Sequence, residues 1–156
     1  MKKILLHAYG NPGRRDDGVG NECISIIERW IQEKDLKHIT PDSSYQLNIE
    51  DASVMAEYAI VIFIDASKGN IDSYTFEPVV PKTSQSFSTH SVSPSALLAL
   101  CGELFNHTPL VYLLQIKGYE WEFGEGLSQK AVENLHNAVN FLQSTVTEFQ
   151  KRESEA

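Results

Sequence analysis

The sequence predicts an α/β fold, a three-layer sandwich in which a mostly parallel (mixed), twisted sheet is flanked by helices. Short apolar runs alternate along the chain with amphipathic segments of helical spacing, as in parallel sheets with crossover helices. Residues 59–64 form the most apolar run, β-branched and uncharged, as expected of a central strand covered on both faces. The 156 residues suffice for one such domain, which we assign to residues 1–150, with a frayed tail expected over residues 151–156.

The chain is expected to begin with a buried strand over residues 3–9, followed by a turn over residues 10–13 that is rich in glycine and proline. A helix is then expected to begin near Gly18, because apolar residues recur at the spacing of a helix face. These residues are Val19, Cys23, Ile26, Ile27 and Trp30.

A short strand is expected over residues 44–47, and a helix capped by Asn48 is expected over residues 49–58. The apolar run 59–64 follows as the central strand, and we expect it to end at Asp65. After this strand we expect an edge strand (residues 74–80), a polar loop (82–90) and a helix (93–105). A buried strand (110–116), an aromatic loop (118–126) and a last amphipathic helix from residue 128 onward are expected to follow.

Composition excludes several classes of function. The net charge of −8 and the lack of a basic stripe disfavour nucleic-acid binding. No segment approaches the roughly 20 apolar residues of a membrane span, and the N-terminal apolar run is too short for a signal peptide, so we expect a cytoplasmic protein without membrane insertion. Cys23 and Cys101 fall in predicted helices and are expected to be free and buried. We expect a monomer.

Three polar side chains follow predicted strands, where open α/β sheets bind their ligands. Asp17 lies at the start of the first helix, Asp65 ends the most apolar strand, and His90 lies in the polar loop before the helix that starts at Ser93. Two carboxylates and an imidazole suit nickel, zinc or a related divalent cation with coordination positions left open. The sequence therefore predicts a metal site formed by these three residues.

Each candidate also has a purely structural interpretation. Asp16 and Asp17 could complement the dipole of the helix that follows, and for Asp16 we expect this capping role. Asp65 could pair with Arg14 or Lys68, and His90 could be a solvated turn residue. Taken singly, the residues favour capping for Asp17 and a solvated loop position for His90. The convergence of all three at strand ends strengthens the metal-site interpretation.

Other residues are expected to support the site or the fold. We expect His7 to be packed or hydrogen-bonded within the first strand, and Asn11 to form the turn rather than to bind substrate. Tyr119, Trp121 and Phe123 in the aromatic loop either form a docking surface for a protein partner or cover the end of the sheet.

The residues resemble one family along nearly the whole chain. Residues 10–20 resemble the opening signature of the hydrogenase maturation peptidases, which has a glycine–asparagine turn, an acidic pair and a helix start flanked by glycines. Residues 62–66 resemble the family's buried strand with its aspartate, and residues 88–90 resemble its histidine loop. Residues 115–120 and 126–128 resemble its last strand, loop and helix.

This resemblance implies a metal-dependent endopeptidase that removes the C-terminal extension of a nickel–iron hydrogenase large-subunit precursor after nickel insertion. Asp17, Asp65 and His90 are the positions that match the family's metal-contacting residues. The resemblance implies that they act through nickel carried by the substrate, and another divalent cation is expected to fill the site in vitro. His7 and Tyr9 depart from the smaller residues that the family usually has there, but neither change removes a ligand.

Two other functions remain open at this point. A non-catalytic chaperone that senses nickel during hydrogenase assembly would use the same three residues. A nucleotide-binding module is suggested by Gly10 and Gly13 after the first strand, although no complete phosphate-binding motif follows and the acidic pair would repel phosphate.

Overall fold

The computed structural model describes residues 2–83 and 92–154. Within this part of the chain, five strands form one sheet in the order β2-β1-β3-β5-β4, in which only β4 is antiparallel to its neighbour. The strands are β1 (Ile4–Tyr9), β2 (Ile39–Ser44), β3 (Ile60–Ser67), β4 (Tyr74–Pro78) and β5 (Leu110–Lys117). The helices are the short 3-10 helix η1 (Arg15–Gly18), α1 (Val19–Lys34), α2 (Asp51–Met55), α3 (Pro94–Phe105) and α4 (Gln129–Ser154).

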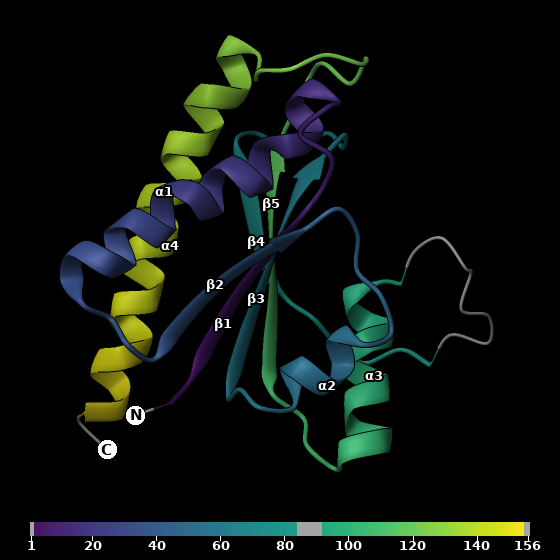
Figure 1. Ribbon diagram of the computed structural model, residues 1–156, viewed down its shortest axis with the longest axis vertical. Helices are drawn as coiled ribbons and strands as arrows, with labels where there is room; N and C mark the ends of the chain where they lie inside the picture. Colours follow the sequence, from purple (N-terminus) through teal and green to yellow (C-terminus); the bar gives the residue numbers. More distant parts are fainter. Residues whose placement is uncertain (1, 84–91, 155–156) are drawn as a thin grey trace.

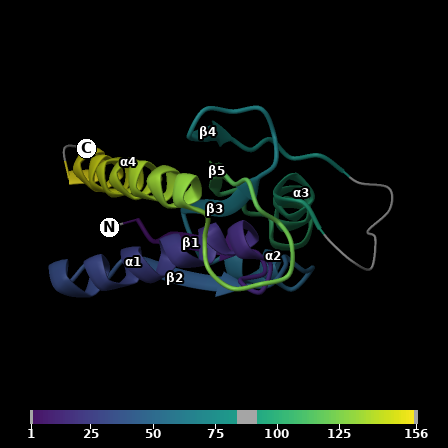
Figure 2. The same cartoon turned by 90° about the horizontal axis from the view of Figure 1, so that it is seen from above.

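Helices cover both faces of the sheet, which confirms the predicted three-layer sandwich (Figures 1 and 2). One apolar core lies between the sheet and the pair α1 and α4, and a second lies between the sheet and the pair α2 and α3. In β1 the side chains alternate between the two cores, with Ile4 and Leu6 in the first and Leu5 in the second. Cys23 and Cys101 are free and buried, one in each core, as expected.

The strand order places a topological switch point between β1 and β3. The chain leaves β1 through α1 to pair β2 on one side, and then returns through α2 to pair β3 on the other side. In open α/β sheets, ligands bind in the crevice outside the carboxyl ends of the strands at such a switch point, which here is the edge formed by the ends of β1 and β3.

The central strand continues beyond the expected end. Its pairing with β1 ends at Ala8 and Ile64, but its pairing with β5 continues through Asp65 to Ser67. The expectation that the strand ends at Asp65 was therefore wrong. Hydrogen bonding to β5 sustains the strand where the apolar pattern has already stopped, so Asp65 is held by regular backbone at the edge of the crevice.

Two elements after the first helix also differ from the sequence prediction. The strand expected over residues 44–47 lies instead at Ile39–Ser44, because β2 is an exposed edge strand that needs little apolar pattern and tolerates Pro41. The helix expected over residues 49–58 is reduced to α2, Asp51–Met55. The predicted cap is also wrong: the N-cap of α2 is Glu50, which makes no side-chain cap hydrogen bond. Asn48 instead donates its backbone N–H to the Asp51 carboxylate at 2.8 Å.

The helices in the range 92–154 agree better with the sequence prediction. Ser93 caps α3 by accepting the backbone N–H of Ala96 at 3.1 Å, and a proline occupies the first turn. Helix α4 begins at Gln129, next to Ser128, and ends at Ser154. It therefore includes residues 151–154 of the segment that was expected to be a frayed tail. Among the described residues, no helix has the length and apolar character needed to cross a membrane.

Candidate functional site at the β1–β3 crevice

Asp17 is held at the crevice by the tight loop between β1 and α1. Its Oδ2 accepts the backbone N–H of Asn11 at 2.8 Å. The Asn11 side chain in turn accepts the N–H of Gly13 at 2.9 Å, which confirms the expected turn-forming role of this asparagine. Gly10 has φ +153°, and a Cβ there would lie 2.1 Å from the Asp17 carbonyl oxygen. The loop can therefore fold back on the end of β1 only because residue 10 is glycine.

Asp65 lies on β3 beside the last residue of β1. Its Oδ1 accepts the backbone N–H of Ala66 at 2.8 Å, and its carboxylate interacts with the Tyr9 side chain. Burial raises the pKa of Asp65 to about 7; the Ala66 hydrogen bond lowers it, the negative charge of Asp17 raises it, and the Tyr9 hydrogen bond lowers it. This carboxylate is thus poorly solvated and faces a like charge.

The structure places two of the three expected site residues on neighbouring segments, Asp17 in η1 and Asp65 in β3. The negative charge of Asp17 is one of the causes that raise the pKa of Asp65. No arginine or lysine of the described residues forms an ion pair with Asp65: Arg14 stacks on Phe123 and Lys68 lies over Trp121. The third residue, His90, lies outside the described residues, and the described part alone contains no group of three metal-binding side chains.

Two facing carboxylates can reduce their repulsion in two ways. One of them can retain a proton at neutral pH, which agrees with the raised pKa of Asp65. Alternatively, a divalent cation can displace that proton and bind both groups, since carboxylate oxygens are ordinary ligands of zinc and nickel. The donor set present in the crevice therefore fits a divalent cation.

Asp16 does not cap the following helix, in contrast to the sequence prediction. Its carboxylate is completely buried and accepts four hydrogen bonds from the loop between β5 and α4. The donors are the backbone N–H groups of Tyr119 (2.7 Å), Glu120 (2.9 Å) and Ser128 (2.7 Å) and the hydroxyl of Ser128 (2.7 Å). Burial alone would raise the pKa of Asp16, but these hydrogen bonds lower it below the usual value.

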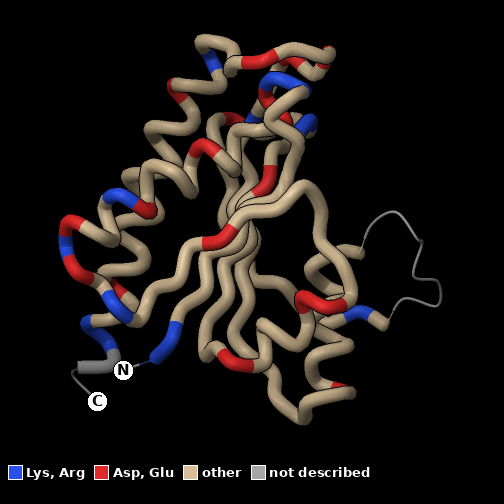
Figure 3. The backbone as a smooth tube through the Cα atoms, in the orientation of Figure 1, with Lys and Arg blue, Asp and Glu red and all other residues tan. Residues whose placement is uncertain are grey.

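Backbone contacts extend the attachment between these two loops, which lie side by side in both views (Figures 1 and 2). The N–H of Arg15 donates to the carbonyl of Gly124 at 3.0 Å, and the N–H of Gly124 donates to the carbonyl of Gly13 at 2.9 Å. Arg15 also forms ion pairs with Glu120 and Glu122, at 3.5 and 3.7 Å. Both loops carry basic and acidic residues (Figure 3). The loop that carries Asp17 is therefore fixed by the loop after β5.

The aromatic residues of the β5–α4 loop play unequal roles. Trp121 is half-buried, and its ring fills the space where a side chain on Gly118 would lie. Phe123 is 77% exposed and its ring stacks against Arg14, while Tyr119 is 38% exposed. Trp121 thus covers the end of the sheet, whereas Phe123 and Tyr119 leave apolar surface in the solvent.

His7 is a buried strand histidine, as expected. Its Nε2 lies 2.9 Å from the Ser44 hydroxyl, and its Nδ1 lies 3.9 Å from the Asp42 carboxylate. Burial lowers the pKa of His7, while the charges of Asp51 and Asp42 raise it. Its polar atoms are directed to β2 and not to Asp17 or Asp65.

The contact between Tyr9 and Asp65 was missed by the sequence analysis. The sequence showed Tyr9 only as a departure from a family pattern. One signal was available: Leu5, His7 and Tyr9 alternate onto one face of β1, so the Tyr9 side chain had to emerge at the carboxyl end of the strand. Which neighbouring strand it meets depends on the strand order, which the pattern does not give.

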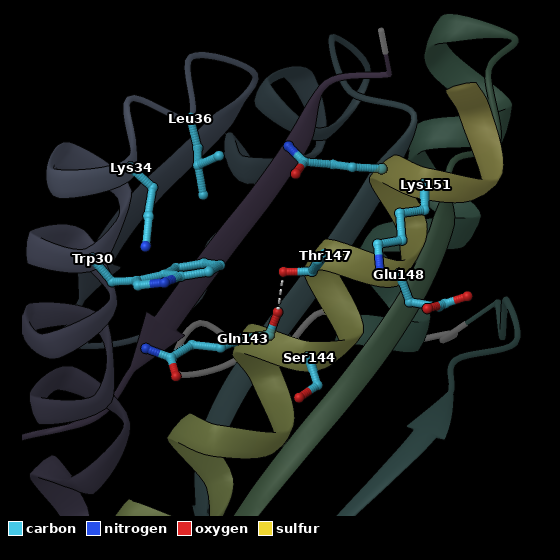
Figure 4. Close-up of a pocket in the computed structure, with 9 residues that line it drawn as sticks. Trp30, Lys34, Leu36, Gln143, Ser144, Thr147, Glu148 and Lys151 are labelled. Atoms are coloured by element: carbon cyan, nitrogen blue, oxygen red, sulfur yellow. Dashed lines mark hydrogen bonds between the residues drawn. The ribbon is translucent and has the colours of Figure 1, made fainter. Parts of the chain in front are cut away.

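A groove of about 650 Å³ lies elsewhere, between α1 and α4 (Figure 4). Trp30 and Lys34 line it from the last turns of α1, and Gln143, Thr147 and Lys151 line it from the second half of α4. Helix α1 starts at the crevice, so this groove lies at the opposite end of the helix from Asp17. It has no part in the site described above.

Comparison with known proteins gives a match in structure but not in sequence. No protein-family model matches the sequence, and no curated protein sequence matches it. The fold is similar to that of the hydrogenase maturating endopeptidase HybD from E. coli, with a TM-score of 0.72, 14% identity, and coverage of 94% of this chain and 93% of the other.

Two archaeal proteins show the same likeness. The NiFe hydrogenase maturation protease HycI from Thermococcus kodakarensis KOD1 gives a TM-score of 0.70 at 16% identity, with 90% of each chain covered. The hydrogenase 2 maturation peptidase from a Thaumarchaeota archaeon gives 0.65 at 15% identity, with 94% of this chain and 99% of the other covered. The chain therefore has the fold found in hydrogenase maturation proteases.

Proposed function

We propose that this protein is a metal-dependent endopeptidase that removes the C-terminal extension of a nickel–iron hydrogenase large-subunit precursor after nickel insertion. In this proposal, Asp17, Asp65 and His90 contact nickel that the precursor carries. The nickel marks a precursor that is ready for cleavage, and it supplies Lewis acidity next to the scissile peptide.

One observation carries this proposal: Asp17 and Asp65, which form no ion pair with an arginine or lysine of the described residues, lie at the carboxyl ends of β1 and β3, at the switch point of the sheet. Burial and, to a smaller extent, the charge of Asp17 raise the pKa of Asp65, so its ionised form is disfavoured in the protein alone. A bound divalent cation would compensate for it. The fold shared with hydrogenase maturation proteases supports a hydrogenase precursor as the source of the cation.

The chain's own residues would serve mainly to position the substrate. Asp17 and Asp65 lie on a loop and a strand that are fixed by backbone hydrogen bonds, so they can hold a metal centre in one orientation. Such fixed placement of a reacting group can contribute several kcal/mol to catalysis, about 7 or more in the best cases. Because the three protein ligands leave coordination positions open, other divalent cations should bind in vitro in place of the substrate nickel.

Two rival functions make different predictions. A nickel-sensing chaperone would bind the precursor through the same residues but leave it uncut. A nucleotide-binding module is disfavoured, because a phosphate in the crevice would meet the carboxylates of Asp17 and Asp65. We further propose that the protein acts as a monomer in the cytoplasm, where its two free buried cysteines would remain reduced.

The deciding experiment incubates the purified protein with nickel-loaded precursor and follows the mass of the large subunit. Shortening of the subunit by a C-terminal fragment supports the endopeptidase. A precursor that is bound but intact supports the chaperone. Precursor without nickel is the control that tests whether nickel is required for cleavage. The variant His90→Ala tests the third ligand, since we expect it to lose processing.

A further inference from the structure

We propose that the β5–α4 loop, together with the basic side chains that lie on its aromatic rings, is a docking surface for an acidic segment of the precursor protein. This inference rests on the proposed function, which supplies the partner, and it adds where and by what chemistry that partner is held. The four basic residues of this surface come from four separate segments of the chain. They are Arg14, Lys68, Lys117 and Lys130.

Two of these cations connect the loop to the neighbourhood of the candidate site. The Cζ of Arg14 lies 4.1 Å from the centroid of the Phe123 ring, and the Nζ of Lys68 lies 4.9 Å from the centroid of the Trp121 ring. Arg14 belongs to the loop that carries Asp17, and Lys68 directly follows β3. The docking surface is therefore continuous with the edge of the sheet where the site lies.

The third ring of the loop holds two cations. The Nζ atoms of Lys117, at the end of β5, and of Lys130, in the first turn of α4, each lie 5.5 Å from the centroid of the Tyr119 ring. The side-chain amide of Asn134 donates to the Tyr119 hydroxyl at 3.1 Å, which fixes the ring between them. Every aromatic ring of the loop thus carries a basic group from outside residues 118–126.

The charges of these four basic groups remain available to a partner. Within residues 2–83 and 92–154, none of the four forms an ion pair with a carboxylate. The acidic side chains of Glu120 and Glu122 are paired instead with Arg15, at 3.5 and 3.7 Å. A cation that lies on a ring keeps its charge on the side that faces the solvent. An incoming carboxylate can therefore form ion pairs here without breaking any that exist.

The exposed ring of Phe123 adds an apolar contact to this charged surface. Its side chain is 77% exposed, and Arg14 packs against the ring. Aromatic and arginine side chains are the residue types most enriched among those that dominate binding at protein interfaces. We therefore expect the docked segment to combine carboxylates with an apolar side chain that packs on Phe123.

The surroundings favour a peptide over a nucleic acid. Basic side chains among aromatic rings also suit single-stranded nucleic acids, whose bases stack on such rings. A continuous phosphate backbone would, however, meet the carboxylates of Asp17 and Asp65 next to this surface, on a chain with a net charge of −8. A peptide with a few spaced carboxylates can place its charges over the four cations alone, within the screening length of roughly 8 Å.

The test uses a short rhodamine-labelled peptide in which glutamate and leucine alternate, followed by fluorescence anisotropy with the full-length, metal-free protein. We expect saturable binding that weakens as salt is added. Phe123→Ala and the double variant Lys68→Gln with Lys130→Gln should each weaken binding by about tenfold. Thermal melting checks that these surface variants remain folded.

Two control variants match these changes elsewhere on the surface. Phe105→Ala removes a ring that is 43% exposed at the end of α3, and the double variant Arg29→Gln with Lys34→Gln removes two exposed cations of α1. Both should bind the peptide like the unmodified protein. A peptide with glutamine in place of glutamate should bind at least about tenfold more weakly, because it offers no charge to the four cations.

Three results would overturn the inference: no binding of the acidic peptide, equal losses in the control variants, or tighter binding of a single-stranded DNA oligonucleotide than of the peptide. The last result would assign the surface to nucleic acid. The assay contains neither metal nor precursor, so peptide binding without precursor cleavage would refute the proposed function alone. Cleavage with a KM for the precursor that is unchanged by Phe123→Ala would refute the docking surface alone.

Discussion

Asp16 and Asp17 are adjacent in the sequence but belong to two regions with opposite character. Asp16 points under the β5–α4 loop, where four donors surround its carboxylate and hold its pKa low. Asp17 lies at the carboxyl end of β1, where its carboxylate accepts one backbone N–H and its charge helps to raise the pKa of Asp65. The first region uses a carboxylate to hold the fold together, and the second leaves carboxylate charge uncompensated and available for a ligand.

The largest expected effect is the loss of function in the crevice. Asp17→Asn and Asp65→Asn should each reduce processing by more than the roughly 100-fold that applies to groups outside the ligand set. The fold should remain, because an amide can still accept the hydrogen bond from Asn11 or Ala66. Mass spectrometry of the precursor and thermal melting of the metal-free variants measure the two effects. Normal processing by either variant would remove that residue from the site.

The opposite outcome is expected for the region around Asp16. Asp16→Ala leaves four buried donors without an acceptor, which should lower the free energy of unfolding by about 3 kcal/mol. Denaturant unfolding, with Asp17→Asn as the matched control, measures this difference. A loss below about 1 kcal/mol would mean that the loop finds other acceptors and that Asp16 is not its main attachment.

The pH dependence of stability should reveal the contribution of the buried Asp16 carboxylate. The pKa of Asp16 in the folded protein lies below its value in the unfolded chain. Its contribution is therefore fully present above about pH 4 and is lost as the pH falls through the folded pKa. We expect the stability of the unmodified protein to fall more steeply below pH 4 than that of Asp16→Asn. Parallel curves from acid denaturation would contradict this assignment.

The smallest effect is expected at the surface of the loop pair. The ion pairs of Arg15 with Glu120 and Glu122 are partly exposed and longer than 3 Å, so Arg15→Ala should lower the free energy of unfolding by less than about 1 kcal/mol. The same denaturant assay measures it. A loss as large as that of Asp16→Ala would show that the charged rim, and not the buried carboxylate, attaches the two loops.

The sequence was sufficient for the fold class because its central strands carry unbroken apolar runs and its long helices carry regular apolar faces. It failed at β2 and α2, where an exposed edge strand and a five-residue helix bury too little to show a pattern. It also placed the end of β3 too early, since the pairing of Ser67 with Lys117 is a tertiary contact.

For the site, the sequence predicted that Asp17 and Asp65 lie at neighbouring strand ends, but it could not tell which of Asp16 and Asp17 is buried under another loop. Either aspartate can cap a helix, and only the approach of the β5–α4 loop, more than 100 residues later, shows which one is buried. The contact of Tyr9 with Asp65 likewise depends on which strand lies next to β1. Contacts that are set by strand order are not encoded in local spacing.

The central claim is that the crevice between β1 and β3 binds a divalent cation, and the most direct test is a crystal structure of the protein soaked with zinc. We expect one ion bound to carboxylate oxygens of both Asp17 and Asp65 at about 2.0–2.2 Å, with His90 as the third protein ligand. An empty crevice, with zinc bound only at other acidic side chains on the surface, would contradict it.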